Sequence, residues 1–93
     1  MVIGLLEVKI SIPEARSLKD KRSVLRGIKD RLVARMNVSV AEVGAQDYWQ
    51  SAEMAMVTVA ATRDVVERRL SELQQFLRSD PRYNLLTVDQ HLM

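Results

Sequence analysis

Apolar and polar residues alternate along the first dozen positions of the chain. Apolar side chains at Val2, Leu6 and each second residue from Val8 to Ile12 share one face, whereas Glu7 and Lys9 fall on the other. Such alternation is typical of a half-buried strand. Pro13 cannot donate to a strand ladder. We therefore predict a β-strand over Val2–Ile12.

A helical pattern follows this first strand. Ser17 with Asp20 resembles a capping box, which predicts a helix that begins near Leu18. Apolar residues then recur at helical spacing, at Leu18, Leu25, Ile28, Leu32 and Met36. Gly27 interrupts this helix away from the apolar stripe, and the pattern offers no reason for a glycine there.

A second helix is predicted in the C-terminal half. Asp64 with Glu67 makes a second capping box, and the helix should end at about Arg78, before the helix-breaking pair Asp80-Pro81. Its apolar stripe consists of Val66, Leu70, Leu73 and Leu77. The stripe predicts that this helix also packs against the core on one face.

Three further strands complete the pattern, at Asn37–Val43, Glu53–Ala61 and Leu85–Leu92. The polar connection Ala45–Ser51 holds the single tryptophan. The order β-α-β-β-α-β predicts a ferredoxin-like sandwich, in which two helices cover one face of a four-stranded antiparallel sheet. This topology brings the start of the first helix, the Ala45–Ser51 connection and the turn with Arg82 to one end of the molecule.

Length and composition limit the classes of protein that fit. Ninety-three residues form one domain, residues 1–93, because so short a chain holds only one core. The absence of cysteine excludes disulfides and thiol catalysis. The first residues lack a basic segment, and Glu7 breaks their apolar run, so we expect neither a signal peptide nor a membrane anchor. We expect a cytoplasmic protein.

Positive charge is concentrated in one segment, although the formal charge of the chain is only +2. Residues 14–35 hold eight basic and three acidic residues, a net charge of +5, whereas the other 71 residues carry −3. Such a separation produces an oriented field that can steer an anionic partner. A charged, solvated helix face is the alternative interpretation.

Two blocks of the sequence resemble a known family. SLKDKRSVL and NVSVAEVGAQDYWQ are similar to the YlxP-like family of small bacterial proteins of unknown biochemical function. The resemblance implies a ferredoxin-like fold and a gene found among genes for translation initiation and ribosome maturation. It implies no catalytic residue. Met36 and Ser51 stand where the family often has an aromatic and a basic residue.

The first helix supplies the candidate binding residues. Lys19, Arg22, Arg26 and Lys29 follow one row beside the apolar stripe, with Lys21 near the seam at the helix start. A row of four cations can follow a phosphate backbone, and the helix N-terminus adds free N–H groups. We predict phosphate contacts from these five residues, with Arg82 as an auxiliary contact.

The loop before the third strand supplies a second group of candidates. We expect Trp49 to fold back over the core, because a lone tryptophan in a short domain is usually an anchor. Stacking of Trp49 on a base is the alternative interpretation. Gln46, Asp47 and Gln50 are the predicted loop contacts, since amide and carboxylate groups can bind the edge of a base.

The predicted sheet face lacks the aromatic residues on which RNA-recognition motifs stack bases, because the third strand reads MAMVTVA. Both sides of this strand are apolar, with Met54 and Met56 on one and Val57 and Val59 on the other, and Ile3 and Leu5 make the second face of the first strand apolar as well. An apolar open face suggests burial against a second copy of the chain. We expect a homodimer.

Catalytic patterns are weak in this chain. The single histidine, His91, lies two residues from the C-terminus, and there is neither a nucleophile elbow nor a glycine-rich phosphate loop. We expect a non-enzymatic protein without a cofactor. The sequence favours a module that binds RNA or the ribosome, and a dimeric protein-interaction or regulatory module is the alternative.

Overall fold

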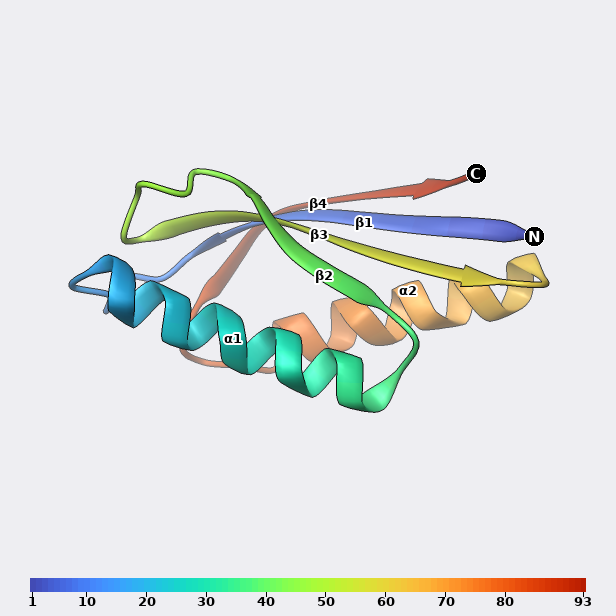
Figure 1. The fold of residues 1–93 in the computed structure, drawn as a ribbon, viewed down its shortest axis with the longest axis horizontal. Coiled ribbons are helices and arrows are strands. Elements are labelled where there is room, and N and C mark those ends of the chain that lie inside the picture. The colour runs from blue at the N-terminus through green and yellow to red at the C-terminus, as the bar shows by residue number, and fades with distance from the viewer.

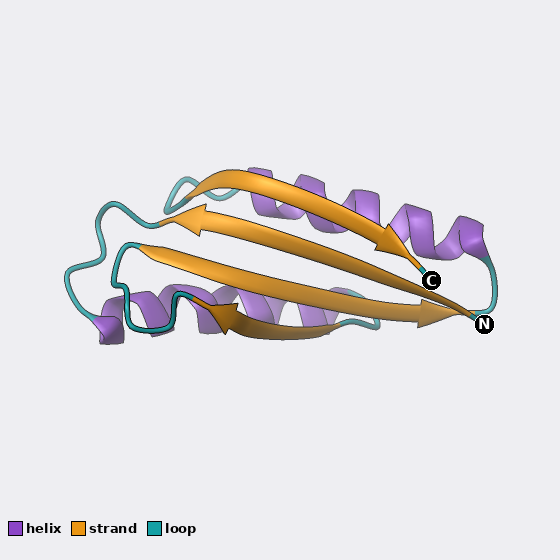
Figure 2. Cartoon of the chain, turned by 90° about the horizontal axis from the view of Figure 1, so that it is seen from above, coloured by secondary structure: helices purple, strands orange, loops and turns teal.

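The computed structural model describes all 93 residues, in the element order β-α-β-β-α-β. The strands are β1 (Val2–Ser11), β2 (Ser39–Gly44), β3 (Ser51–Ala60) and β4 (Asn84–Leu92), and the helices are α1 (Leu18–Arg35) and α2 (Arg63–Arg78). The strands form one antiparallel sheet in the order β2-β3-β1-β4. Both helices cover the same face of it (Figure 1 and Figure 2). The predicted ferredoxin-like sandwich is confirmed.

Helix α1 begins where the capping box places it. Ser17 is the N-cap, and its Oγ accepts a hydrogen bond from the Asp20 N–H at 3.1 Å. The Asp20 carboxylate in turn accepts from the Arg16 N–H at 2.9 Å. The first bond satisfies a free N–H group of the first turn, and the second, to the residue before the N-cap, fixes the direction from which the chain enters the helix.

Helix α2 begins slightly earlier than its predicted cap. Thr62 is the N-cap, with its Oγ1 accepting from the Val65 N–H at 3.5 Å, so the prediction of an Asp64–Glu67 capping box was wrong. Glu67 instead accepts from Arg63 Nε at 2.8 Å, one turn before it. Thr62 is extended and has a side-chain acceptor, so it caps the helix before Asp64 is reached.

The core lies between the helices and the covered face of the sheet. It is built from the apolar stripes that the sequence predicts, and residues such as Leu6, Ile28 and Leu70 are fully buried. Gly4 on β1 lies where α2 approaches most closely, because a Cβ there would lie 2.5 Å from Val66 Cγ1. The close packing of α2 on β1 therefore requires a residue without a side chain at this position.

The uncovered face of the sheet is divided into two halves. Near the chain termini it is apolar, with Val57 and Val59 about 40% exposed beside the half-buried Ile3 and Leu5. The other half carries the charged side chains Glu7, Lys9, Glu53 and Asp89, with 3.4 Å between Lys9 Nζ and Glu53 Oε1, and His91, opposite Leu5, borders it with its Nε2 3.4 Å from Glu7 Oε1. Neither helix combines the length and the apolar character that a membrane-spanning helix needs.

Gly4 in β1 and Gly27 in α1 should respond in opposite ways to substitution by alanine. Gly4→Ala forces α2 away from β1 and should lower the free energy of unfolding by about 1–3 kcal/mol. Gly27→Ala should raise it by about 1 kcal/mol, because alanine favours a helix over glycine. A Cβ at Gly27 meets only the Arg82 guanidinium, at 3.6 and 3.7 Å, which is ordinary van der Waals contact.

Urea denaturation of both variants beside the unchanged protein measures these shifts. A Gly4→Ala protein as stable as the parent would show that α2 does not need its close approach to β1.

Candidate nucleic-acid interface

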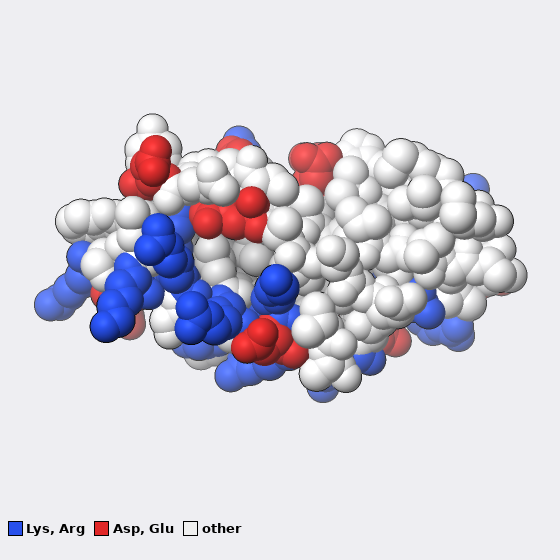
Figure 3. Space-filling model, in the orientation of Figure 1, with Lys and Arg blue, Asp and Glu red and all other residues white.

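The predicted row of cations is exposed along α1. Lys19, Arg22, Arg26 and Lys29 all face solvent, and none of them forms an ion pair with a carboxylate of the chain. Figure 3 shows lysine and arginine side chains gathered over the first part of α1, at one end of the molecule. The positive charge at this end is therefore available to a partner.

Three cations of the row also border a groove. Arg22, Arg26 and Lys29 lie along its α1 side together with Asp30, and the edge strand β2, which carries Glu42, forms the other side. The groove has a volume of about 550 Å³, and its apolar lining consists of Leu25, Val40, Ala41 and Met54. An extended anionic chain that follows α1 could therefore contact both its cations and an apolar floor.

Lys21 lies in the interior, although it was predicted to contact phosphate. Its side chain is only 1% exposed, and its Nζ lies 2.7 Å from a carboxylate oxygen of Glu42. Nζ also donates hydrogen bonds to the carbonyl oxygens of Ala45, Gln46 and Ser51, at 2.8, 3.3 and 3.1 Å. The prediction that Lys21 contacts phosphate was therefore wrong, because all its donors are used inside the protein.

Helical spacing carried a signal for this burial. Lys21 lies three residues after Leu18 and four before Leu25, on the apolar stripe itself. A lysine on the core side of a helix needs buried acceptors. Those acceptors belong to the β2–β3 connection, which packs against the first turns of α1 (Figure 1 and Figure 2).

The loop residues differ in their availability. Gln46 and Asp47 have exposed side chains, as predicted. Gln50 instead uses its amide group to tie the loop to the chain before α1, with Nε2 donating to the carbonyl oxygens of Pro13 and Ala15 at 3.0 and 3.2 Å. The prediction of Gln50 as a free ligand contact was wrong in this respect, because both amide hydrogens have partners within the chain.

Trp49 does not fold back over the core. Its side chain is 53% exposed and that of Tyr48 is 67% exposed, so the prediction that Trp49 is a core anchor was wrong. The core is closed without it, since the aliphatic stripes of both helices already cover the sheet. Residues 47–51 surround a hollow of about 420 Å³ at this tip.

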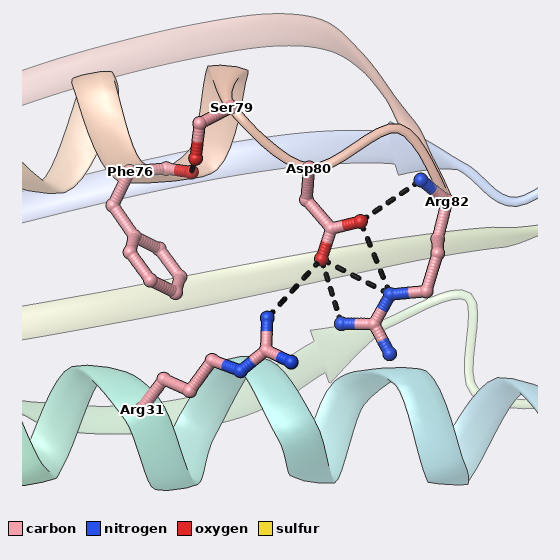
Figure 4. Close-up of polar contacts among 5 residues, drawn as sticks. All are labelled: Arg31, Phe76, Ser79, Asp80 and Arg82. Atoms are coloured by element: carbon pink, nitrogen blue, oxygen red, sulfur yellow. Dashed lines mark hydrogen bonds and ion pairs between the residues drawn. The ribbon is translucent and has the colours of Figure 1, made fainter.

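Arg82 is held by a neighbouring carboxylate, as Figure 4 shows. Its guanidinium lies 2.6 Å from Asp80 Oδ2, and its backbone N–H donates to Asp80 Oδ1 at 2.9 Å. Arg31 of α1 lies 3.8 Å from the same carboxylate. Arg82 therefore sits over the middle of α1, beside Gly27, and its charge is largely neutralised, which weakens its predicted role as a phosphate contact.

The turn that carries Arg82 holds three ionisable groups whose pKa values are shifted. The hydrogen bond from Arg82 lowers the pKa of Asp80 below its ordinary range and raises the pKa of Arg82. Burial raises the pKa of Tyr83 to about 12, and the Tyr83 hydroxyl is buried without a hydrogen-bond partner. The shifts of Asp80 and Arg82 thus arise from the ion pair between them, which also joins the turn to Arg31 of α1, and the shift of Tyr83 arises from its burial.

Comparison with known proteins agrees with this fold and these motifs. Residues 3–90 match the family described as "Protein of unknown function (DUF503)". The chain belongs to this family. It is 38% identical, over 80 residues, to the uncharacterized protein YlxP of Bacillus subtilis (strain 168), covering 86% of this chain and 87% of that protein. The resemblance noted in the sequence is thereby confirmed.

Solved structures show the same architecture in designed proteins. The de novo designed protein Foldit4 has a TM-score of 0.54 at 13% identity and covers 98% of this chain and 96% of its own. The de novo designed protein LFR1 1 with ferredoxin fold has a TM-score of 0.54 at 16% identity, over 99% of this chain and 85% of its own. At such low identities the likeness concerns the fold alone.

The Asp80–Arg82 pair predicts a defined pH dependence of stability. Because folding lowers the pKa of Asp80, its contribution is present above the ordinary carboxyl pKa and is lost as the pH falls through the folded value. Asp80→Asn should lower the free energy of unfolding by about 1 kcal/mol at pH 7, since Arg82 is partly exposed. This difference should shrink as the pH falls below the ordinary carboxyl pKa toward the lowered pKa of Asp80 in the folded protein.

Urea denaturation of both proteins at a series of pH values from 7 downward measures the difference. A gap between variant and parent that stays constant across this range would show that the charge of Asp80 does not stabilise the fold.

Proposed function

We propose that the protein is a non-enzymatic module that binds RNA, free or within a ribosomal particle, through the outer flank of α1 and the β2–β3 loop. The observation that carries this proposal is the row of four exposed, unpaired cations, Lys19, Arg22, Arg26 and Lys29. Cations on a rigid helix can neutralise successive phosphates of a nucleic-acid backbone. The gene neighbourhood that the family resemblance implies points in the same direction.

The surroundings of the row support an anionic partner. On the opposite flank of α1, Arg31 approaches Asp80 and Arg35 lies 5.5 Å from the centre of the Phe76 ring, so these two cations have partners within the protein. The acidic residues of the uncovered sheet face lie in the charged half of that face, where Glu53 pairs with Lys9 and not with a cation of α1. Four cations without an internal partner thus lie in one row on one flank of α1, whereas the exposed Arg68 and Arg78 lie on α2.

The sheet face supports a different kind of contact. It carries no aromatic side chain, because the four aromatic residues lie in the β2–β3 loop, on α2 and at Tyr83 in the turn before β4. Bases therefore have no stacking surface there. Its apolar half fits a second copy of the chain, since a two-fold axis through that half would place identical apolar patches together. A dimeric interaction module is accordingly the second candidate function.

Charge reversal on α1 should abolish RNA binding. If four phosphates are contacted, the logarithm of the association constant should fall against the logarithm of salt concentration with a slope of about −3 to −4. Arg22→Glu with Arg26→Glu removes two of these contacts and adds repulsion. The control, Arg68→Glu with Arg78→Glu, changes the net charge equally at two exposed positions of α2.

Fluorescence anisotropy of labelled ribosomal RNA fragments, measured at several salt concentrations, distinguishes these variants. Equal binding by both double variants would contradict a role for the α1 row. An absence of binding at low salt, with sedimentation showing a dimer, would favour the interaction module.

A further inference from the structure

We infer that Tyr48 and Trp49 form a base-stacking platform, and that the RNA is single-stranded where it passes the β2–β3 loop. This inference rests on the proposed function and assigns a ligand class to the loop end of the same surface. The observation behind it is the exposure of two neighbouring aromatic side chains to solvent. Two of the four aromatic residues of the chain are adjacent and more than half exposed, although aromatic side chains contribute most when they are buried.

The two aromatic residues stand on a loop that is fixed at both ends. Lys21 binds the carbonyl oxygens of Ala45, Gln46 and Ser51, which flank them in sequence. Gln50, directly after Trp49, is tied by its side chain to the segment before α1, and its carbonyl oxygen accepts from the Ile12 N–H at 2.8 Å.

Within the loop, the Tyr48 N–H donates to the Ala45 carbonyl at 3.1 Å, and Ala45 takes the left-handed conformation, with a φ of 57°, that turns the chain. The backbone that carries the two aromatic side chains is therefore held in place before any ligand arrives, so less backbone entropy is lost on binding.

The platform is adjacent to the cations. Lys21, which anchors the loop, lies between Lys19 and Arg22 on the first turns of α1. Figure 3 shows the basic side chains of α1 directly beside the loop end of the molecule. A strand that contacts Lys19 and Arg22 through its phosphates and continues toward the β2–β3 loop would meet Tyr48 and Trp49, and the exposed side chains of Gln46 and Asp47 in the same loop carry groups that can bind the edge of a base.

Stacking selects the form of the nucleic acid. In a duplex, both faces of each base are covered by its neighbours, whereas an unpaired strand can place a base on an aromatic ring. Backbone contacts from lysine and arginine do not make this distinction. The aromatic tip therefore predicts a preference for single-stranded RNA that the cations alone would not produce.

Trp49 is the only tryptophan of the chain, so its fluorescence reports directly on stacking. We expect a single-stranded RNA decamer to quench it. A blunt duplex of the same length and inorganic polyphosphate should bind the cations with little quenching. Trp49→Ala should weaken binding of the single strand roughly tenfold without changing the salt slope, and Trp49→Phe should weaken it less. Leu86→Ala, at a 60% exposed position on β4, is the control and should bind as the parent does.

The outcomes separate the inference from the proposed function. One result would contradict the stacking platform but still support the RNA-binding module. In it, RNA binding depends on salt and is lost in Arg22→Glu/Arg26→Glu, but Trp49→Ala does not weaken it or the RNA does not quench the tryptophan. Equal affinity for the single strand and the duplex would also overturn the platform. An absence of RNA binding by the unchanged protein at low salt would overturn both.

Discussion

The arrangement of this surface depends on one buried ammonium group. Lys21 Nζ is surrounded by the Glu42 carboxylate and three carbonyl oxygens of the β2–β3 connection. Removing an ammonium group from water costs several kcal/mol, and only complete pairing offsets this cost. The geometry of the connection is therefore coupled to the start of α1, and the loop cannot move away from the helix without leaving this charge uncompensated.

This coupling assigns different tasks to the basic residues of α1. Lys21 faces inward and holds the loop, while Arg31 and Arg35 on the α2 flank contact Asp80 and the Phe76 ring. The row from Lys19 to Lys29 on the other flank remains in solvent. The basic residues of α1 thus have three roles: Lys21 holds the β2–β3 loop, Arg31 and Arg35 contact α2 and the turn after it, and the row from Lys19 to Lys29 stays in solvent. The position of each residue around the helix determines its role.

Periodicity predicts most of the fold because each element has its own local signal. The apolar stripes, the alternation in the strands and the Ser17 cap identify every helix and strand, and the exposed row follows from the same helical geometry. The Thr62 cap was missed because Asp64 with Glu67 offered a competing local pattern. Helices and strands with such local signals can be predicted without knowing which distant segments contact each other.

The features that the sequence did not predict depend on contacts between residues far apart in the chain. The burial of Lys21 depends on carbonyl groups 24 to 30 residues away, and the Gln50 bonds depend on residues 35 and 37 positions before it. Gly27 has a neighbour, Arg82, that the topology brings to the middle of α1. The exposure of Trp49 likewise follows from a core that closes without it, and composition alone favoured the opposite expectation.

The most direct test of the buried Lys21 contacts is the free energy of unfolding of Lys21→Met, compared with that of Lys19→Met. Both substitutions remove one positive charge from the first turns of α1 and keep a side chain of similar length. Loss of the buried group should cost about 3 kcal/mol, because Glu42 and three carbonyl groups lose their partner, whereas the exposed Lys19 should cost less than about 0.5 kcal/mol. Equal stabilities of the two variants would show that Lys21 does not hold the loop to the helix.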